Sequence, residues 1–274
     1  MKIIAMDLDG TLLNEKKQLT PRTFRALQAA AERGHLLVPA TGRALRAIPE
    51  EILSLPFVRY VISINGASVS DERTGERLYC AEIPKDTALA LMDFAKRYDC
   101  MYDCYWQDTG WSNRAFLERV RYYNHFDEAV VQLILRSRQP VENLEQLIRD
   151  QAETVQKVQL CFRDLDERAA AREAIQMQFP DIVATSSFQN NLELNWKTAD
   201  KGRALLHLAE RLGVPAADTL AFGDSSNDLS MLKAVGTGVA MGNASEEVRA
   251  ACDAVTATNE EDGVAVYLER YVLA

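Results

Sequence analysis

The sequence DLDGT at residues 7–11 follows directly on the apolar run IIAM at residues 3–6, near the start of a chain of 274 residues. A short apolar run of this kind is typical of a buried strand in a parallel sheet, and Gly10 permits a sharp turn that residues with a Cβ atom adopt poorly. The two carboxylates therefore stand at the carboxyl end of a strand, where open α/β sheets bind their ligands. Because like charges this close repel each other, the pair favours a hard divalent cation as its partner.

Polar turns follow three further apolar runs. Residues 36–38 precede the turn at 41–43, residues 58–64 precede Asn65-Gly66-Ala67, and residues 219–222 precede Gly223-Asp224. The pattern predicts several strands that all end in loops suited to ligand binding.

Helical patterns alternate with these strands. They predict helices over residues 20–34 and 200–212 and a final helix that ends at residue 270. Asn243 is expected to cap a further helix that ends near residue 250. The alternation predicts an α/β fold with a Rossmann-like, doubly wound parallel sheet.

Residues 83–190 differ in composition from the rest of the chain. Gly110 is the only one of the 13 glycines in this segment, which is rich in aromatic residues. It is predicted to be an inserted α+β domain that divides the core into residues 1–82 and 191–274. Helices are expected near residues 86–98 and 165–178, and strands near 101–106, 156–162 and 182–187.

Charge and composition exclude several classes of function. A formal net charge of −9 argues against a broad surface for nucleic acids or anionic membranes. The chain has no apolar run of about 20 residues and no signal-peptide core, so a cytoplasmic protein is expected. Its five cysteines lack a Cys-x-x-Cys pair and are expected to be free thiols, with no zinc site.

The polar strand ends and helix starts can converge at one edge of a parallel sheet. Each motif alone is typical of a cap or a solvated loop. Together they supply a nucleophile, an acid or base, ligands for a cation and donors for phosphate oxygens, as phosphoryl transfer requires. The set comprises Asp7 and Asp9, Thr41-Gly42, Lys201-Gly202, and Gly223-Asp224 with Asn227 and Asp228. Arg43 is expected to form a surface or interdomain pair instead.

This set resembles the haloacid dehalogenase (HAD) superfamily, whose phosphotransferases carry Asp-x-Asp-x-Thr, a strand-end Thr or Ser, a Lys and Gly-Asp-x-x-x-Asp. All four motifs occur here in that order. Asn65-Gly66-Ala67, Lys201-Gly202, the sequence GDSSND at 223–228 and the long insertion resemble the Cof-like phosphatases of this superfamily. The resemblance extends over essentially the whole chain.

The resemblance implies a role for each motif. Asp7 would attack phosphorus and become an aspartyl-phosphate, and Asp9 would protonate the leaving oxygen and then activate water. Mg²⁺ would be held by Asp7, the backbone carbonyl of Asp9 and Asp224, with Asp228 as a direct ligand or a partner of the ligands. The groups implied to bind the phosphate oxygens are the N–H groups of Leu8 and Gly42, the Thr41 hydroxyl, Asn227 and Lys201.

The expected function is hydrolysis of a small phosphorylated metabolite, a sugar phosphate first and a phosphorylated cofactor next. The inserted cap would select the leaving group, and the enzyme would be a monomer or a homodimer. A phosphomutase with the same chemistry and a non-catalytic sensor of phosphorylated metabolites remain alternatives. Dehalogenation is disfavoured because Asp9 supplies an acid that a halide does not need.

Overall fold

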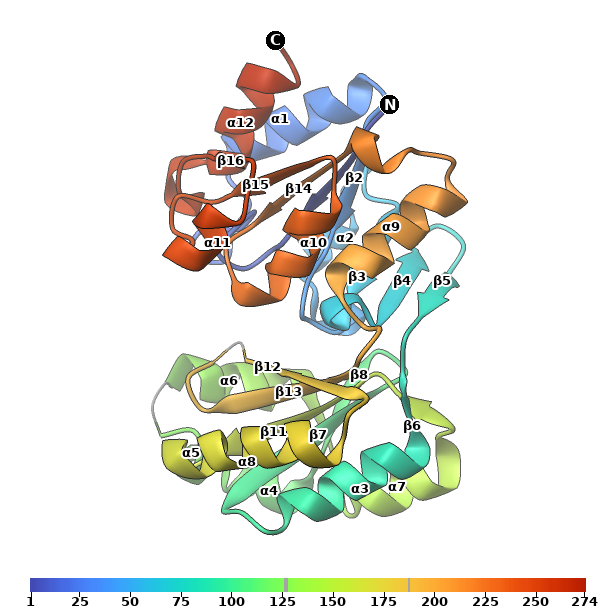
Figure 1. The fold of residues 1–274 in the computed structure, drawn as a ribbon, viewed down its shortest axis with the longest axis vertical. Helices are drawn as coiled ribbons and strands as arrows, with labels where there is room; N and C mark the ends of the chain where they lie inside the picture. Colours follow the sequence, from blue (N-terminus) through green and yellow to red (C-terminus); the bar gives the residue numbers. More distant parts are fainter. Residues whose placement is uncertain (126–127, 187) are drawn as a thin grey trace. The chain divides into compact units, whose positions relative to one another are not determined.

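The computed structural model describes residues 1–125, 128–186 and 188–274 (Figure 1). The chain forms two compact units. Unit 1 comprises Met1–Arg43, Ile48–Cys80 and Ala199–Ala274, and unit 2 comprises Ala44–Ala47 and Ala81–Thr198.

A five-stranded parallel sheet forms the centre of unit 1, in the order β16-β15-β14-β1-β2. Its strands are β1 (Ile3–Met6), β2 (Leu36–Pro39), β14 (Thr219–Gly223), β15 (Thr237–Ala240) and β16 (Ala254–Val255). The order along the sheet reverses beside β1, because β1 lies between β2 and β14. Such a switch point opens a crevice at the carboxyl ends of the strands. The α/β prediction is therefore confirmed.

A second, antiparallel sheet of unit 1 has the order β3-β4-β5. Its strands are β3 (Tyr60–Ser63), β4 (Ser68–Asp71) and β5 (Glu76–Cys80). Bridges from Leu37 to Val58 and from Ala40 to Ile62 join β2 to the β3 segment.

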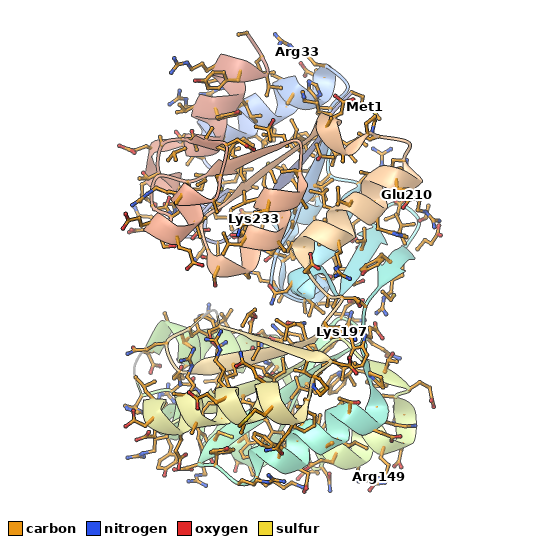
Figure 2. The ribbon with its side chains drawn as sticks, in the orientation of Figure 1. Met1, Arg33, Arg149, Lys197, Glu210 and Lys233 are labelled. Atoms are coloured by element: carbon orange, nitrogen blue, oxygen red, sulfur yellow. The ribbon has the colours of Figure 1, made fainter. Side chains whose placement is uncertain are left out.

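Helices surround the parallel sheet of unit 1 (Figure 1). They are α1 (Pro21–Glu32), α2 (Glu50–Leu53), α9 (Lys201–Arg211), α10 (Leu229–Ala234), α11 (Glu246–Ala250) and α12 (Gly263–Tyr271). Apolar residues such as Ile3, Ala204 and Leu205 form the core between sheet and helices, and outward positions such as Glu210 and Lys233 are exposed (Figure 2).

Asn243 does not cap α11, contrary to the sequence prediction. The side chain of Ser245 accepts the capping hydrogen bond from the N–H of Val248. Asn243 instead donates to the Gly10 carbonyl at 2.8 Å and accepts from the N–H of Asn259 at 3.0 Å. Its amide is thus used in contacts between loops, which a local sequence pattern does not reveal.

A six-stranded sheet with the order β12-β13-β11-β7-β8-β9 forms the centre of unit 2, and β6 and β10 make a separate pair. The strands are β6 (Ile83–Pro84), β7 (Cys100–Trp106), β8 (Thr109–Asn113), β9 (Arg138–Val141), β10 (Thr154–Val155), β11 (Lys157–Phe162), β12 (Ile182–Thr185) and β13 (Asn191–Trp196). The helices are α3 (Lys85–Ala95), α4 (Arg114–Glu118), α5 (Val120–Tyr123), α6 (Glu128–Ser137), α7 (Leu144–Gln151) and α8 (Leu165–Gln178).

One face of the six-stranded sheet packs on an apolar core that includes residues of α3, α7 and α8. The strand predicted over 182–187 ends at Thr185, and position 187 lies outside the described residues. No helix in the described part of the chain is both long and apolar enough to span a membrane. The five cysteines are free.

Candidate active site

The carboxyl ends of β1 and β14 hold the acidic residues of the site. The two strands pair in parallel, with Met6 opposite Phe222, so they end at the same edge of the sheet. Asp7 follows β1, Asp224 follows β14, and one carboxylate oxygen from each lies within 4.8 Å of one from Asp228. Three carboxylate oxygens this close form the kind of donor set that Mg²⁺ prefers.

Lys201 joins two of these acids from the start of α9. Its buried ammonium Nζ lies 2.6 Å from Asp7 Oδ1 and 2.6 Å from Asp228 Oδ1. Gly202 allows α9 to approach α10 closely, because a Cβ atom on it would stand 2.4 Å from the Ser230 carbonyl oxygen. Burial alone would lower the pKa of Lys201, but the charges of Asp228 and Asp7 outweigh burial and raise it. Lys201 therefore stays charged and offsets part of the acidic repulsion.

Asp224 is oriented by the loop that follows β1. The Thr11 hydroxyl donates to Asp224 Oδ1 at 2.9 Å, and the Ser225 hydroxyl donates to Oδ2 at 3.0 Å. Gly10 has a φ of 85°, and a Cβ atom there would stand 2.5 Å from Asp224 Oδ2. The glycine is thus needed both for its backbone conformation and for the approach of the carboxylate.

Both oxygens of Asp228 are already used within the protein. Oδ2 accepts from the N–H groups of Asp224 and Ser225, each at 3.0 Å, while Oδ1 contacts Lys201. These bonds fix the turn that presents Asp224. Whether Asp228 is a direct ligand or a partner of the ligands stays a prediction.

Burial raises the pKa of Asp7 to about 8, although Lys201 opposes the shift, and the neighbouring Asp228 adds to it. Burial also raises the pKa of Asp224, again with a contribution from Asp228. Two carboxyls that resist ionisation side by side favour a bound cation, because the cation stabilises both in their charged form.

Without a divalent cation, the free energy of unfolding of the wild type is expected to decrease relative to that of Asp7→Asn as the pH rises from about 4 to about 8. In this interval the folded protein holds a proton on Asp7, whose pKa is raised from 3.8 to about 8, and the unfolded chain does not. Mg²⁺ should remove this decline because it binds the anionic form. Melting temperatures of both proteins across pH, with chelator and with Mg²⁺, test the prediction, which a metal-free difference that rises with pH would contradict.

Two cations hold Asp9, the second acid of the opening motif. Arg43 donates from Nε to Oδ2 and from Nη2 to Oδ1, each at 2.7 Å, and Lys17 Nζ lies 2.9 Å from Oδ1. Burial would raise the pKa of Asp9, but the hydrogen bonds and charges of Arg43 and Lys17 lower it. Neither cation was predicted from the sequence to belong to the site. Arg43 directly follows the Thr41-Gly42 motif, and this position next to a predicted site motif could have indicated that it belongs to the site.

Replacing Arg43 by Met is expected to move the acidic limb of the pH–rate profile to higher pH. Arg43 favours the charged form of Asp9, so its loss raises the pKa of the group that would have to be ionised to act as the base in hydrolysis of an aspartyl-phosphate. The measurement is kcat against pH, because this hydrolysis step does not enter kcat/KM, with Arg46→Met as the control because Arg46 is exposed. An unchanged acidic limb in Arg43→Met would count against a role for Asp9 in that limb.

Three of the residues predicted to bind phosphate oxygens, Thr41, Gly42 and Asn227, lie around Asn65. A Cβ atom on Gly42 would stand 2.8 Å from Asn65 Oδ1, and Asn227 Nδ2 donates to the same oxygen at 3.1 Å. Thr41 is buried, and its hydroxyl accepts from the N–H of Arg43 at 3.2 Å. Leu8, which stands between Asp7 and Asp9 in the sequence, has a buried side chain. Asn65 thus connects the two loops that carry Gly42 and Asn227, a role that its sequence motif did not reveal.

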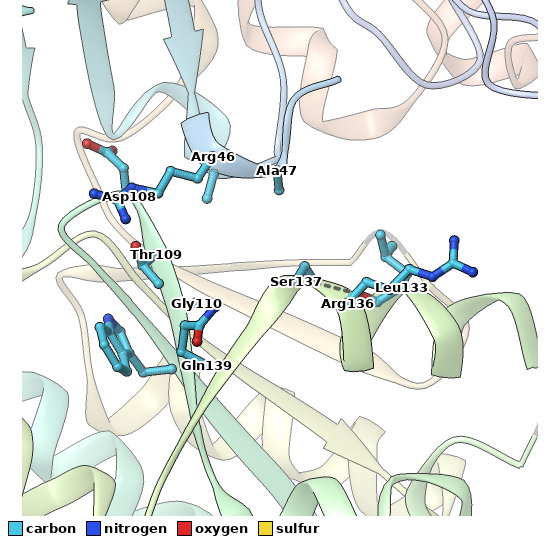
Figure 3. A pocket seen from close by; sticks show the side chains of 11 residues that line it. Arg46, Ala47, Asp108, Thr109, Gly110, Leu133, Arg136, Ser137 and Gln139 are labelled. Atoms are coloured by element: carbon cyan, nitrogen blue, oxygen red, sulfur yellow. Dashed lines mark hydrogen bonds between the residues drawn. The ribbon is translucent and has the colours of Figure 1, made fainter. Parts of the chain in front are cut away.

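A pocket of about 590 Å³ lies in unit 2 and shares no lining residue with this site. Figure 3 shows Arg46 and Arg136 directed to different sides, so these two cations do not form a clamp for one anion. The pocket is lined by Ala44, Arg46, Ala47, Asp108, Thr109, Gly110, Trp111, Leu133, Arg136, Ser137 and Gln139.

Comparisons with known proteins agree with this geometry. A family model described as haloacid dehalogenase-like hydrolase matches residues 4–268. The phosphatase YwpJ of Bacillus subtilis is 34% identical over 97% of this chain and 98% of the relative. A second relative from that organism, the 5-amino-6-(5-phospho-D-ribitylamino)uracil phosphatase YwtE, is 30% identical over 98% of each chain.

A solved structure shows the same fold. A haloacid dehalogenase-like hydrolase from B. subtilis superimposes with a TM-score of 0.84 and 32% identity, over 99% of this chain and 100% of the other. The chain therefore belongs to the haloacid dehalogenase-like hydrolase family, and its place there is among the Cof-like phosphatases.

Proposed function

We propose that the protein is a Mg²⁺-dependent phosphatase that hydrolyses a small phosphorylated metabolite through an aspartyl-phosphate on Asp7. The observation that carries this proposal is the buried contact of Lys201 with Asp7 Oδ1 beside Asp224 and Asp228. Among the described residues, no hydrogen bond is assigned to Asp7 Oδ2. One oxygen is thus anchored while the other has a lone pair available for attack.

In the first step, Asp7 Oδ2 forms a bond to phosphorus as the ester P–O bond breaks, and Asp9 gives a proton to the leaving oxygen. In the second, Asp9 takes a proton from water as the water oxygen attacks phosphorus, which releases phosphate and restores Asp7. Arg43 and Lys17 favour the charged form of Asp9 that the second step needs. To act as an acid in the first step, Asp9 must separate from Arg43.

Asp7, Asp224 and the backbone carbonyl of Asp9 would hold Mg²⁺, which supplies charge neutralisation for the phosphoryl group when bound. Lys201 orients Asp7, and the Thr41 hydroxyl with the amide of Asn227 would donate to the phosphate oxygens. Donors fixed before the reaction stabilise charge without reorganisation.

The substrate class follows from the relatives and from the second unit. YwtE is named for a phosphorylated ribitylamino compound, and sugar phosphates or phosphorylated cofactors are the corresponding small molecules proposed here. Unit 2, within which the inserted segment 83–190 falls, would contact the leaving group and select it. We propose no binding surface for nucleic acids or membranes. The protein would act as a monomer or a homodimer.

The test is release of inorganic phosphate from a panel of phosphorylated sugars, cofactors and nucleotides, with Mg²⁺ or with chelator. Mg²⁺-dependent, stoichiometric release is expected. Isomerised sugar phosphate without free phosphate would show a phosphomutase instead. Tight binding of a panel member without Mg²⁺ and without turnover would show a sensor.

A further inference from the structure

The turn that follows β3 has an unusual backbone. Its three residues, Ile64, Asn65 and Gly66, all have a positive φ, at 51°, 54° and 89°. Glycine and asparagine tolerate this left-handed conformation, but a β-branched residue such as Ile64 adopts it only under strain. All three residues are buried. Strain of this kind persists where the surrounding structure holds it in place, and it is concentrated at functional sites.

Backbone contacts hold this turn between two other segments of the site. The N–H of Asn65 donates to the carbonyl oxygen of Thr41 at 3.0 Å, in the loop that follows β2. A Cβ atom on Gly66 would stand 2.3 Å from the carbonyl oxygen of Asp200, so the turn packs directly against the start of α9, next to Lys201. These contacts use backbone atoms and the missing Cβ of a glycine, and they do not require the amide side chain of Asn65.

The side chain of Asn65 contacts a third segment. Its Oδ1 accepts a hydrogen bond from Asn227 Nδ2 at 3.1 Å, and a Cβ atom on Gly42 would stand 2.8 Å from the same oxygen. Asn65 is 5% exposed, and Asn227 is half-buried. All of these residues belong to unit 1. One buried oxygen thus borders two groups that are predicted to bind phosphate.

The hydrogen bond from Asn227 to Asn65 selects which end of the Asn227 amide lies beside Gly42. The terminal torsion of an asparagine is roughly two-fold, so without a partner the carbonyl oxygen and the nitrogen can exchange places. A carbonyl oxygen there would repel phosphoryl oxygens. Nδ2 carries two hydrogens, of which Asn65 accepts one. In the described part of the chain, the second hydrogen has no assigned acceptor.

We infer that Asn65 is a positioning residue for phosphoryl transfer, whose side-chain oxygen keeps the nitrogen of Asn227 directed at the phosphoryl group. This inference rests on the proposed phosphatase function, in which Asn227 donates to a phosphate oxygen. Asn65 acts through Asn227 and does not contact the substrate. A donor that is fixed before the reaction stabilises the developing charge without reorganisation, so Asn65 contributes only while Asn227 is present.

The test is a double-mutant cycle, with kcat/KM measured on p-nitrophenyl phosphate with Mg²⁺. Asn65→Gly removes the amide, while glycine keeps the left-handed backbone. We expect kcat/KM to decrease about tenfold in Asn65→Gly and about 10²-fold in Asn227→Ala, which removes the donor itself. Because Asn65 acts through Asn227, the double variant should also lose about 10²-fold. A loss of about 10³-fold in the double variant, the product of the two single losses, would overturn the inference.

Stability distinguishes positioning from a purely structural role. The backbone contacts of the turn remain in Asn65→Gly, so this variant should fold and bind Mg²⁺. Asn143→Gly is the matched control, because the side chain of Asn143 also accepts a hydrogen bond, from the N–H of Gln146 at the start of α7 in unit 2. Its kcat/KM should remain within about twofold of the wild type. Failure of Asn65→Gly to fold, or a lower melting temperature with unchanged kcat/KM, would overturn the inference.

A binding measurement separates failure of the inference from failure of the proposed function. Orthovanadate adopts the five-coordinate geometry of a transferred phosphoryl group, and its binding in the presence of Mg²⁺ is measured by calorimetry without turnover. Asn65→Gly should bind it about tenfold more weakly than the wild type, whereas adding Asn65→Gly to Asn227→Ala should change nothing.

The outcomes of the two measurements are distinct. If the wild type releases no phosphate but the vanadate pattern appears, hydrolysis fails and the positioning of Asn227 by Asn65 stands. If the wild type releases phosphate but the losses multiply, the proposed function stands and the inference fails. A wild type that neither releases phosphate nor binds vanadate would overturn both.

Discussion

Replacement of Asp7 by Asn is expected to lower phosphate release by about 10⁴-fold or more, since loss of a nucleophile removes the covalent step. The amide keeps the shape of the carboxylate but lacks a charged oxygen able to attack phosphorus. Burial already raises the pKa of Asp7 to about 8, so a neutral group is compatible with the folded site. Without metal, the melting temperature of Asp7→Asn should therefore equal or exceed that of the wild type. Its loss of activity would then come from the missing nucleophile and not from unfolding.

Asp86→Asn is the matched control for this change. Asp86 lies in the first turn of α3 in unit 2 and is exposed, so the same substitution should leave turnover and stability nearly unchanged. Activity of Asp7→Asn within tenfold of the wild type would sink the assignment of Asp7 as nucleophile.

Replacement of Lys201 by Met is expected to lower both activity and stability. Lys201 is fully buried and contacts Asp7 and Asp228, each at 2.6 Å, so its loss leaves two acids without their shared cation. Breaking a buried pair in this way costs about 3–5 kcal/mol in the free energy of unfolding. Loss of the charge that orients the nucleophile should lower kcat by about 10²-fold or more.

Lys197→Met is the control for Lys201→Met. Lys197, labelled in Figure 2, pairs with Asp181 at 2.5 Å, but its side chain is 54% exposed. Exposed pairs contribute about 0–1 kcal/mol, so denaturant unfolding should separate the two variants clearly. Added Mg²⁺ should restore part of the stability of Lys201→Met, because it also neutralises Asp7. Equal stabilities of the two variants would contradict the buried role of Lys201.

Local sequence patterns were sufficient for the strands β1, β2 and β14 of unit 1. The apolar runs before Asp7 and Gly223 form the adjacent parallel strands β1 and β14, because short buried strands and their turns leave a local signal. The same patterns brought together Asp7, Asp224, Asp228 and Lys201, which the structure places in one cluster. Parallel strands end at one edge, so the convergence follows from topology.

Contacts between distant segments of the chain could not be predicted from these local patterns. The bidentate contact of Arg43 with Asp9 depends on how two loops meet, and no local periodicity encodes it. Strand β13 (Asn191–Trp196) was missed, although Leu192, Leu194 and Trp196 alternate with polar residues and gave a usable signal. The pairing of Asp103 with Arg138 needed the register of the sheet, which only the structure supplies.

Direct detection of the aspartyl-phosphate tests the central claim. The Asp9→Asn protein, which lacks the base for hydrolysis, is mixed with Mg²⁺ and p-nitrophenyl phosphate, whose leaving group needs no general acid, quenched in acid and analysed by peptide mass spectrometry. The account predicts a phosphoryl group on Asp7 in the peptide that contains residues 7–11, and none in the Asp7→Asn protein. Phosphate release by the wild type with no phosphorylated peptide in Asp9→Asn, or with the group on another residue, would contradict it.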